Sequence, residues 1–412
     1  MDRSKRKFTA CLIWLCWLVY ACSYIGKLNY AANINQVMAF YQVDHAQAGL
    51  VSTLFFFAYG IGQFVNGAFC KKYNLKYVVF CSLAVSATIN LAVGLSTNFA
   101  LIQILWLVNG FSMSILWPSM VRVLSETVDG QEMPKVSVIM GTTVAVGTLF
   151  VYAVSALFVK WDFKLSFYLP ALIMFALAFV WLLSVSKLVS GAKAECQELQ
   201  TQNEAVDEKQ DKKYDKLTLL FTVVILAFYG VATNLIKDGL TTWVPSILKE
   251  QYHLDGSISI VLTLALPIVG IFANAFAIKL HKKIPDYVFL CAVMFIISGA
   301  IIGGVIAGIS LNQFIITLIG FTAVCFLATA CNSVITSIFP LLMKGKVNSG
   351  MIAGVLNGFC YLGSTVSAYG LGAVADNFGW TSVFWVLLAV CALVFAVALV
   401  YSIVKKLKKQ DK

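Results

Sequence analysis

The sequence predicts an all-α polytopic membrane protein with about twelve transmembrane helices in two six-helix halves. Three observations support this fold class. Hydrophobic residues make up 60% of the 412 residues and charged residues only 12%, whereas a soluble domain carries about 25% charged residues. Apolar runs of about 20 residues, the length of a membrane-spanning helix, recur from end to end. A polar segment near the middle of the chain divides these runs into two sets.

The predicted spans follow one another with short connections. In the first half they cover residues 8–39, 46–70, 76–97, 100–124, 135–159 and 164–187. In the second half they cover residues 216–248, 257–281, 286–309, 312–342, 348–374 and 381–404. We interpret the first span as a retained helix, because its apolar stretch is longer than the ~7–15 residues of a signal-peptide core.

The segment between the halves, residues 190–215, is rich in Glu, Gln, Asp and Lys and has no aromatic residue before Tyr214. Such a composition cannot bury a core, so it predicts a flexible cytoplasmic linker. The expected domains are therefore a six-helix N-terminal half, residues 1–189, and a six-helix C-terminal half, residues 216–412.

The net charge of +11 is concentrated in a few basic clusters, at residues 3–7, 71–76, 279–283 and 405–409. Basic loops mark the cytoplasmic side, and an even number of spans puts both termini on one side. We therefore expect a multi-pass protein of the plasma (cytoplasmic) membrane with both termini in the cytoplasm. Nucleic-acid binding is not predicted, because no basic stretch outside the spans is interleaved with base-stacking aromatic residues.

Cysteines and histidines form no pattern of a catalytic or metal site. Most of the 11 cysteines lie singly within apolar spans, which favours packing roles, and the three histidines fall in short loops or at helix ends. No nucleotide-binding loop or nucleophile motif is present either. The sequence therefore predicts no enzyme activity, no cofactor and no metal.

Two lysines, Lys27 and Lys237, lie deep in apolar spans, about half a chain apart. A charge inside the bilayer costs several kcal/mol unless it faces a polar cavity or a partner. Each lysine follows the start of the first span of its half by roughly 20 residues, so the pair predicts one anion site shared by the two halves. The alternative is that each lysine side chain extends along its flexible hydrocarbon chain to the membrane surface.

Polar residues share the helix face of each lysine, at spacings of three, four or seven positions. Around Lys27 they are Tyr20, Ser23, Tyr24 and Tyr30, with Asn29 and Asn33 close by. Around Lys237 they are Thr233, Asn234 and Thr241, with Tyr229 two turns earlier. A lipid-facing stripe would be apolar, so both faces are predicted to line a cavity. Ammonium groups beside hydroxyl and amide groups suit a phosphate or a carboxylate.

Two further charged residues lie near these faces. Asp238 follows Lys237, but adjacent positions diverge on a helix, so Asp238 is expected to pair with another cation or to carry a proton. Arg122 lies near the inner end of the fourth span, where snorkelling or structural pairing is the expected role. Trp117, a few turns deeper, is a candidate to line the cavity.

Several stretches around these residues are similar to motifs of one family, the organophosphate:phosphate antiporters of the major facilitator superfamily. They are residues 24–30, 58–67, 109–111, 117–122, 237–245 and 358–380. The resemblance implies the major facilitator fold and places Lys27 and Lys237 at the positions of two phosphate-binding arginines. It also places aromatic cavity residues at Tyr20, Tyr24, Tyr59, Trp117 and Tyr361.

The function implied by this resemblance is secondary active transport of a small anionic, phosphorylated organic metabolite by alternating access, in exchange for phosphate. Glycerol 3-phosphate and hexose phosphate transporters are members of the family. The chain departs from the family pattern in having lysines for both arginines, Gln63 at an expected lysine, and the additional Asp238. Proton-coupled symport of an organic acid or sugar derivative is one alternative, and a transporter-like membrane sensor is another. The expected partners are the metabolite, inorganic phosphate or protons, and the lipid bilayer, with the protein as a monomer.

Overall fold

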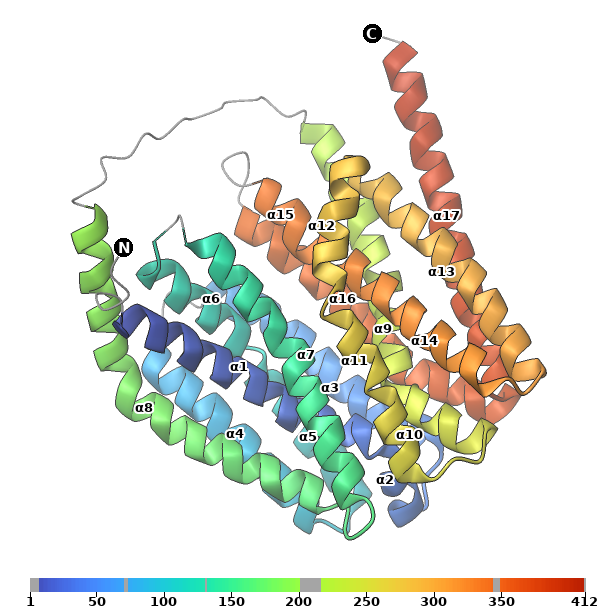
Figure 1. Cartoon of the computed structure of the whole chain (residues 1–412), viewed down its shortest axis with the longest axis horizontal. Coiled ribbons are helices and arrows are strands. Elements are labelled where there is room, and N and C mark those ends of the chain that lie inside the picture. The colour runs from blue at the N-terminus through green and yellow to red at the C-terminus, as the bar shows by residue number, and fades with distance from the viewer. Residues whose placement is uncertain (1–6, 70–72, 130–131, 201–215, 344–348, 411–412) are drawn as a thin grey trace. The chain divides into compact units, whose positions relative to one another are not determined.

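The computed structural model describes residues 7–69, 73–129, 132–200, 216–343 and 349–410. Within these ranges the regular secondary structure is entirely helical (Figure 1). Eleven helical segments of the described chain are long and apolar enough to cross a membrane, which confirms the predicted all-α polytopic fold. The predicted eleventh span, residues 348–374, corresponds to a 30-residue helix that is not among those eleven.

The helices pack into two compact units, unit 1 (Met1–Asn33 and Ala58–Gln210) and unit 2 (Ile34–Phe57 and Asp211–Lys412). Unit 1 contains α1 (Lys7–Ala32), α4 (Leu75–Leu95), α5 (Phe99–Met113), α6 (Leu116–Thr127), α7 (Met133–Phe158) and α8 (Leu165–Gln200). Unit 2 contains α2 (Ile34–Tyr41), α9 (Lys216–Gln251), α10 (Gly256–Thr263), α11 (Ala265–Gly270), α12 (Ala273–Lys283), α13 (Tyr287–Ser310), α14 (Phe314–Ser333), the π-helical turn η3 (Val334–Ile338), α15 (Phe339–Leu342), α16 (Ser349–Phe378) and α17 (Trp380–Gln410). The helix α3 (His45–Phe69) begins in unit 2 and ends in unit 1.

In unit 1, α1 packs against α7 and α8, and α4 runs beside α8 (Figure 1). Residues such as Leu12, Leu83, Met120 and Trp181 are buried in a shared core. In unit 2, α9 packs along α16, while α13 contacts α14 and α17. Leu183 on α8 is 80% exposed and represents the outward apolar surface that lipid covers in a membrane protein.

Close approach of α9 and α16 depends on small residues. A Cβ atom at Gly363 of α16 would lie 2.0 Å from the carbonyl oxygen of Val231 on α9. The start of α3 also packs on α16, since a Cβ atom at Gly49 would lie 2.3 Å from the carbonyl oxygen of Ala368. Thr53 donates to the carbonyl oxygen of Thr365 at 2.8 Å in the same contact. Residues 34–57, which the sequence analysis placed in the N-terminal half, therefore pack with unit 2.

Several predicted spans are interrupted where proline removes a backbone donor. The predicted span 100–124 consists of α5 and α6, separated by Ser114 and Ile115. Pro118 has no N–H to bond the carbonyl oxygen of Ser114, and that oxygen instead accepts from Gln63 at 3.0 Å. Pro340 also lacks a backbone N–H. It follows the π-helical turn η3, near the end of the span predicted over 312–342.

The predicted linker is partly helical, because α8 continues through Gln200. Polar side chains at a helix end that extends beyond the membrane can remain in water, so composition alone did not reveal this extension. Residues 201–215 of that linker, the basic stretch 3–6, and Lys71 and Lys72 lie outside the described residues.

Candidate functional site

Lys27 lies in unit 1 and is only 9% exposed. Its Nζ atom lies 4.5 Å from the ring centre of Tyr59 on α3 and 5.0 Å from that of Tyr24 on α1. Tyr20 packs against Tyr24 at 5.5 Å between ring centres and against Trp117 of α6 at 4.7 Å. A cation over aromatic faces gains about 2 kcal/mol when both are desolvated. The fold thus brings together five of the predicted binding residues.

Amide side chains hold the C-terminal part of α1 in place. The carbonyl oxygen of Gly26, next to Lys27, accepts from Asn90 of α4 at 3.2 Å and from Asn109 of α5 at 3.1 Å. Asn29 donates to Asn90 Oδ1 at 2.7 Å and to the carbonyl oxygen of Ser166 at 3.0 Å. These buried bonds fix the rotation of α1, and therefore the direction of Lys27.

The remaining polar residues predicted to share the Lys27 face have structural contacts. Tyr30 is fully buried and packs against Trp106, with 5.6 Å between ring centres. Ser23 donates to the carbonyl oxygen of Tyr20 within its own helix at 2.6 Å. Asn33 donates to Ser155 at 2.9 Å. Their positions fix helix packing, a role that helical spacing alone does not distinguish from lining a cavity.

Lys237 lies in unit 2 and forms an ion pair with its sequence neighbour Asp238, with 3.1 Å between Nζ and Oδ1. The expectation that adjacent positions keep these side chains apart was wrong. The lysine side chain has enough rotatable bonds to bend along the helix surface, so its terminal nitrogen reaches the neighbouring carboxylate. Asp238 was expected to pair with another cation, but in the structure its ion-pair partner is Lys237 itself.

A chain of hydrogen bonds from three helices ends on Asp238. Asn332 of α14 donates to Asn234 Oδ1 of α9 at 2.8 Å, and Asn234 donates to Ser364 Oγ of α16 at 3.1 Å. Ser364 then donates to Asp238 Oδ2. The sequence identified Lys237, Asp238 and Asn234 for this cluster, but not Ser364 or Asn332.

Two other predicted residues, Tyr361 and Arg122, have contacts of their own. Tyr361 of α16 packs near Phe56, with 6.4 Å between ring centres, in unit 2. Arg122 donates to Glu126 Oε1 at 2.8 Å and to the carbonyl oxygen of Tyr73 at 3.1 Å. These contacts are the structural pairing expected for Arg122.

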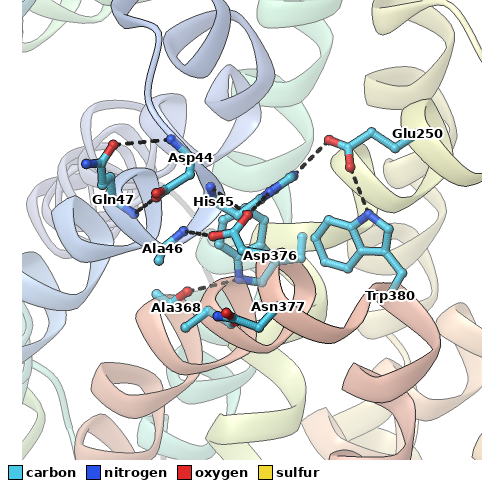
Figure 2. A network of polar contacts seen from close by, with 11 residues as sticks. Asp44, His45, Ala46, Gln47, Glu250, Ala368, Asp376, Asn377 and Trp380 are labelled. Carbon is cyan, nitrogen blue, oxygen red and sulfur yellow. Dashed lines mark hydrogen bonds and ion pairs between the residues drawn. The ribbon is translucent and has the colours of Figure 1, made fainter.

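A second polar network in unit 2 was not anticipated. Figure 2 shows His45, the first residue of α3, between two carboxylates, with Nδ1 2.5 Å from Asp376 Oδ1 and Nε2 2.8 Å from Glu250 Oε1. Asp376 also accepts from the backbone N–H of Ala46 at 2.7 Å, and Glu250 accepts from Trp380 at 2.9 Å. An imidazolium ring satisfies both carboxylates, because only that form donates from both nitrogens.

This network joins the start of α3 to the ends of α9 and α16 and to the first residue of α17. A carboxylate at a helix N-terminus also complements the positive end of the helix dipole. The signal available in the sequence was the stretch 376–380, which the family resemblance singled out without assigning it a partner.

Comparisons with characterised sequences identify relatives along most of the chain. The "Probable hexose phosphate transport protein" of Chlamydia pneumoniae is 22% identical over 405 residues, covering 90% of this chain and 86% of that protein. "Sugar phosphate exchanger 3" of Bos taurus is 21% identical over 395 residues, covering 84% of this chain and 78% of that protein. "Membrane sensor protein UhpC" of Escherichia coli is 27% identical over 125 residues, which are 30% of this chain and 28% of the sensor's length.

Solved structures share the fold at low sequence identity. A bacterial homologue of the human lysosomal transporter Spinster superposes with a TM-score of 0.72 at 12% identity, covering 96% of this chain and 97% of that one. A D-xylose-proton symporter gives a TM-score of 0.69 with the same identity and coverage. The sequence model of the Major Facilitator Superfamily matches residues 16–368. The chain is therefore a member of the Major Facilitator Superfamily.

Proposed function

We propose that the protein is a secondary active transporter that moves a phosphorylated sugar, or a similar small phosphorylated metabolite, by alternating access in exchange for inorganic phosphate. The observation that carries this proposal is the buried ammonium group of Lys27, 4.5 Å and 5.0 Å from the ring centres of Tyr59 and Tyr24. A buried cation among phenol groups is suited to an anionic phosphoryl group. The names of two relatives aligned over most of the chain support the same substrate class.

The substrate-binding residues in this proposal are Lys27, Tyr20, Tyr24, Tyr59 and Trp117 of unit 1 and Lys237, Asn234 and Tyr361 of unit 2. Arg122 has a structural role. The six-helix halves, residues 1–189 and 216–412 with the polar segment 190–215 between them, are the moving parts of alternating access. The protein acts as a monomer in the plasma membrane, with both termini in the cytoplasm.

Uptake into proteoliposomes tests the proposal. Vesicles loaded with inorganic phosphate should take up labelled glucose 6-phosphate faster than vesicles without it. Lys27→Ala should lower that uptake about tenfold or more, because a charge-assisted hydrogen bond contributes about 1.5–3 kcal/mol. Lys76→Ala is the matched control, because the Nζ atom of Lys76 also lies over an aromatic ring, 5.7 Å from the ring centre of Tyr77. Wild-type uptake by Lys27→Ala would contradict the site assignment.

Proton-coupled symport is the second candidate, and the observation that favours it is the carboxylate of Asp238 beside Lys237. A symporter would accumulate substrate in vesicles without internal phosphate when an inward proton gradient is imposed. Exchange would instead require internal phosphate and would not respond to that gradient. A sensor would bind glucose 6-phosphate without either flux.

A further inference from the structure

The Lys237–Asp238 pair is partly exposed, and its two opposite charges compensate each other. The two side chains are 25% and 17% exposed, and 3.1 Å separates Nζ from Oδ1. A phosphoryl group approaching this pair is attracted by the ammonium group and repelled by the carboxylate. At similar distances these two Coulomb energies largely cancel. The pair is therefore a weak site for a multiply charged anion.

A hydrogen-bond chain behind the pair ends on the second carboxylate oxygen of Asp238. Asn332 donates to Asn234, Asn234 donates to Ser364, and Ser364 donates to Asp238 Oδ2. Aligned hydrogen bonds polarise one another, and a bond to an ionised acceptor is stronger than one between neutral groups. Three helices thus contribute to holding the carboxyl group of Asp238 beside Lys237.

The bonding capacity left on the pair matches hydroxyl groups. Lys237 carries three N–H donors, and a carboxylate offers about four lone-pair positions, of which Lys237 and Ser364 occupy two. Donors and acceptors therefore lie side by side at one place. A hydroxyl group donates and accepts at once, whereas an ionised phosphoryl group only accepts.

We propose that Lys237 and Asp238 together bind hydroxyl groups on the uncharged part of the substrate, and that they do not bind its phosphoryl group. This inference rests on the proposed function, in which Lys27 binds the phosphoryl group. It departs from the family resemblance, which places Lys237 at the position of a phosphate-binding arginine. Asp238 is then a specificity-determining residue for a polyhydroxylated organic phosphate.

The test compares two fluxes in the same proteoliposomes, each against internal phosphate: uptake of labelled glucose 6-phosphate and uptake of labelled inorganic phosphate. Asp238→Asn and Lys237→Gln should each lower the ratio of glucose 6-phosphate to phosphate uptake by about tenfold or more, since each removes a charged hydrogen-bond partner of a hydroxyl. Lys27→Gln should lower both fluxes together. Lys249→Gln, on the same helix as Lys237, is the control and should keep the wild-type ratio.

The outcomes separate the two proposals. If the wild type shows neither flux, the proposed function is refuted, and the assignment falls with it. If the wild type is active and Lys237→Gln lowers both fluxes in parallel, as Lys27→Gln does, the assignment alone is refuted. An unchanged ratio in Asp238→Asn also refutes it. Thermal melting in detergent establishes that each variant is folded. A competition binding assay on the purified variants, with phosphate and glucose 6-phosphate as competitors, compares the affinities for the two anions without transport.

Discussion

Gly363 provides a direct test of the contact between α9 and α16. A Cβ atom added there would lie 2.0 Å from the carbonyl oxygen of Val231, 2.8 Å from its carbonyl carbon and 3.0 Å from the backbone nitrogen of Leu235. Non-bonded heavy atoms are most stable about 3.5–4.0 Å apart, so Gly363→Ala requires the two helices to separate by roughly 1.5 Å. The obstructing atoms belong to the backbone of α9, so no change of side-chain rotamer can relieve the clash.

The expected cost follows from this geometry. Overpacking in a well-packed interior costs about 1–3 kcal/mol, and a rigid obstacle places this substitution near 3 kcal/mol. The same displacement would stretch the bond from Trp243 to the carbonyl oxygen of Ala368, now 3.1 Å, and the 3.1 Å bond from Asn234 to Ser364. Gly363→Ala should therefore weaken the polar cluster at Lys237 as well as the helix contact.

Thermal unfolding in detergent, followed by tryptophan fluorescence, measures this loss. A destabilisation of 3 kcal/mol corresponds to a fall of about 6–12 °C in Tm for a unit of about 200 residues. Gly354 is the matched control, because it lies on the same helix and a Cβ atom there meets nothing within 4 Å. Gly354→Ala should change the free energy of unfolding by no more than about 1 kcal/mol. Equal melting temperatures for the two variants would refute the close-contact argument.

Other contacts make three further predictions. Asp376→Ala should lower the free energy of unfolding by about 2–4 kcal/mol, because Asp376 accepts two backbone hydrogen bonds at the start of α3 and pairs with His45. Asn377→Ala is the control in the same melting assay. The Asn377 amide donates to the carbonyl oxygen of Ala373 within α16, so this variant should cost under about 1 kcal/mol. Asn29→Leu should cost about 2–3 kcal/mol and lower glucose 6-phosphate uptake, since two buried bonds that orient α1 are lost; wild-type uptake would contradict this role. Arg122→Ala should cost about 1 kcal/mol or less and leave uptake at the wild-type level, whereas a large loss of uptake would indicate a role in coupling.

Local sequence patterns were sufficient to group some residues of the candidate site. Lys27, Tyr24 and Tyr20 follow a spacing of three and four residues, and a helix places such positions on one face whatever else the chain does. Tyr30 meets the same spacing but is fully buried against Trp106. Spacing identifies which residues can share a face, while packing decides which of them face the lysine.

Contacts between distant residues were outside the reach of the sequence. His45 and Asp376 are 331 residues apart, and Asp238 and Ser364 are 126 apart. Their meeting depends on the rotation and approach of whole helices, which small residues such as Gly363 allow. Neither hydropathy nor helical periodicity contains that information.

By itself, the sequence determined the membrane class, the helical spans and the energetic anomaly of two lysines in apolar segments, because hydropathy, helix length and the cost of a buried charge are local quantities. Only the tertiary structure decided how those lysines differ. It places Lys27 among aromatic rings and Lys237 beside Asp238, at the end of a hydrogen-bond chain from three helices. The environment of a charge is set by groups brought together from distant parts of the chain, and local sequence patterns do not specify those groups.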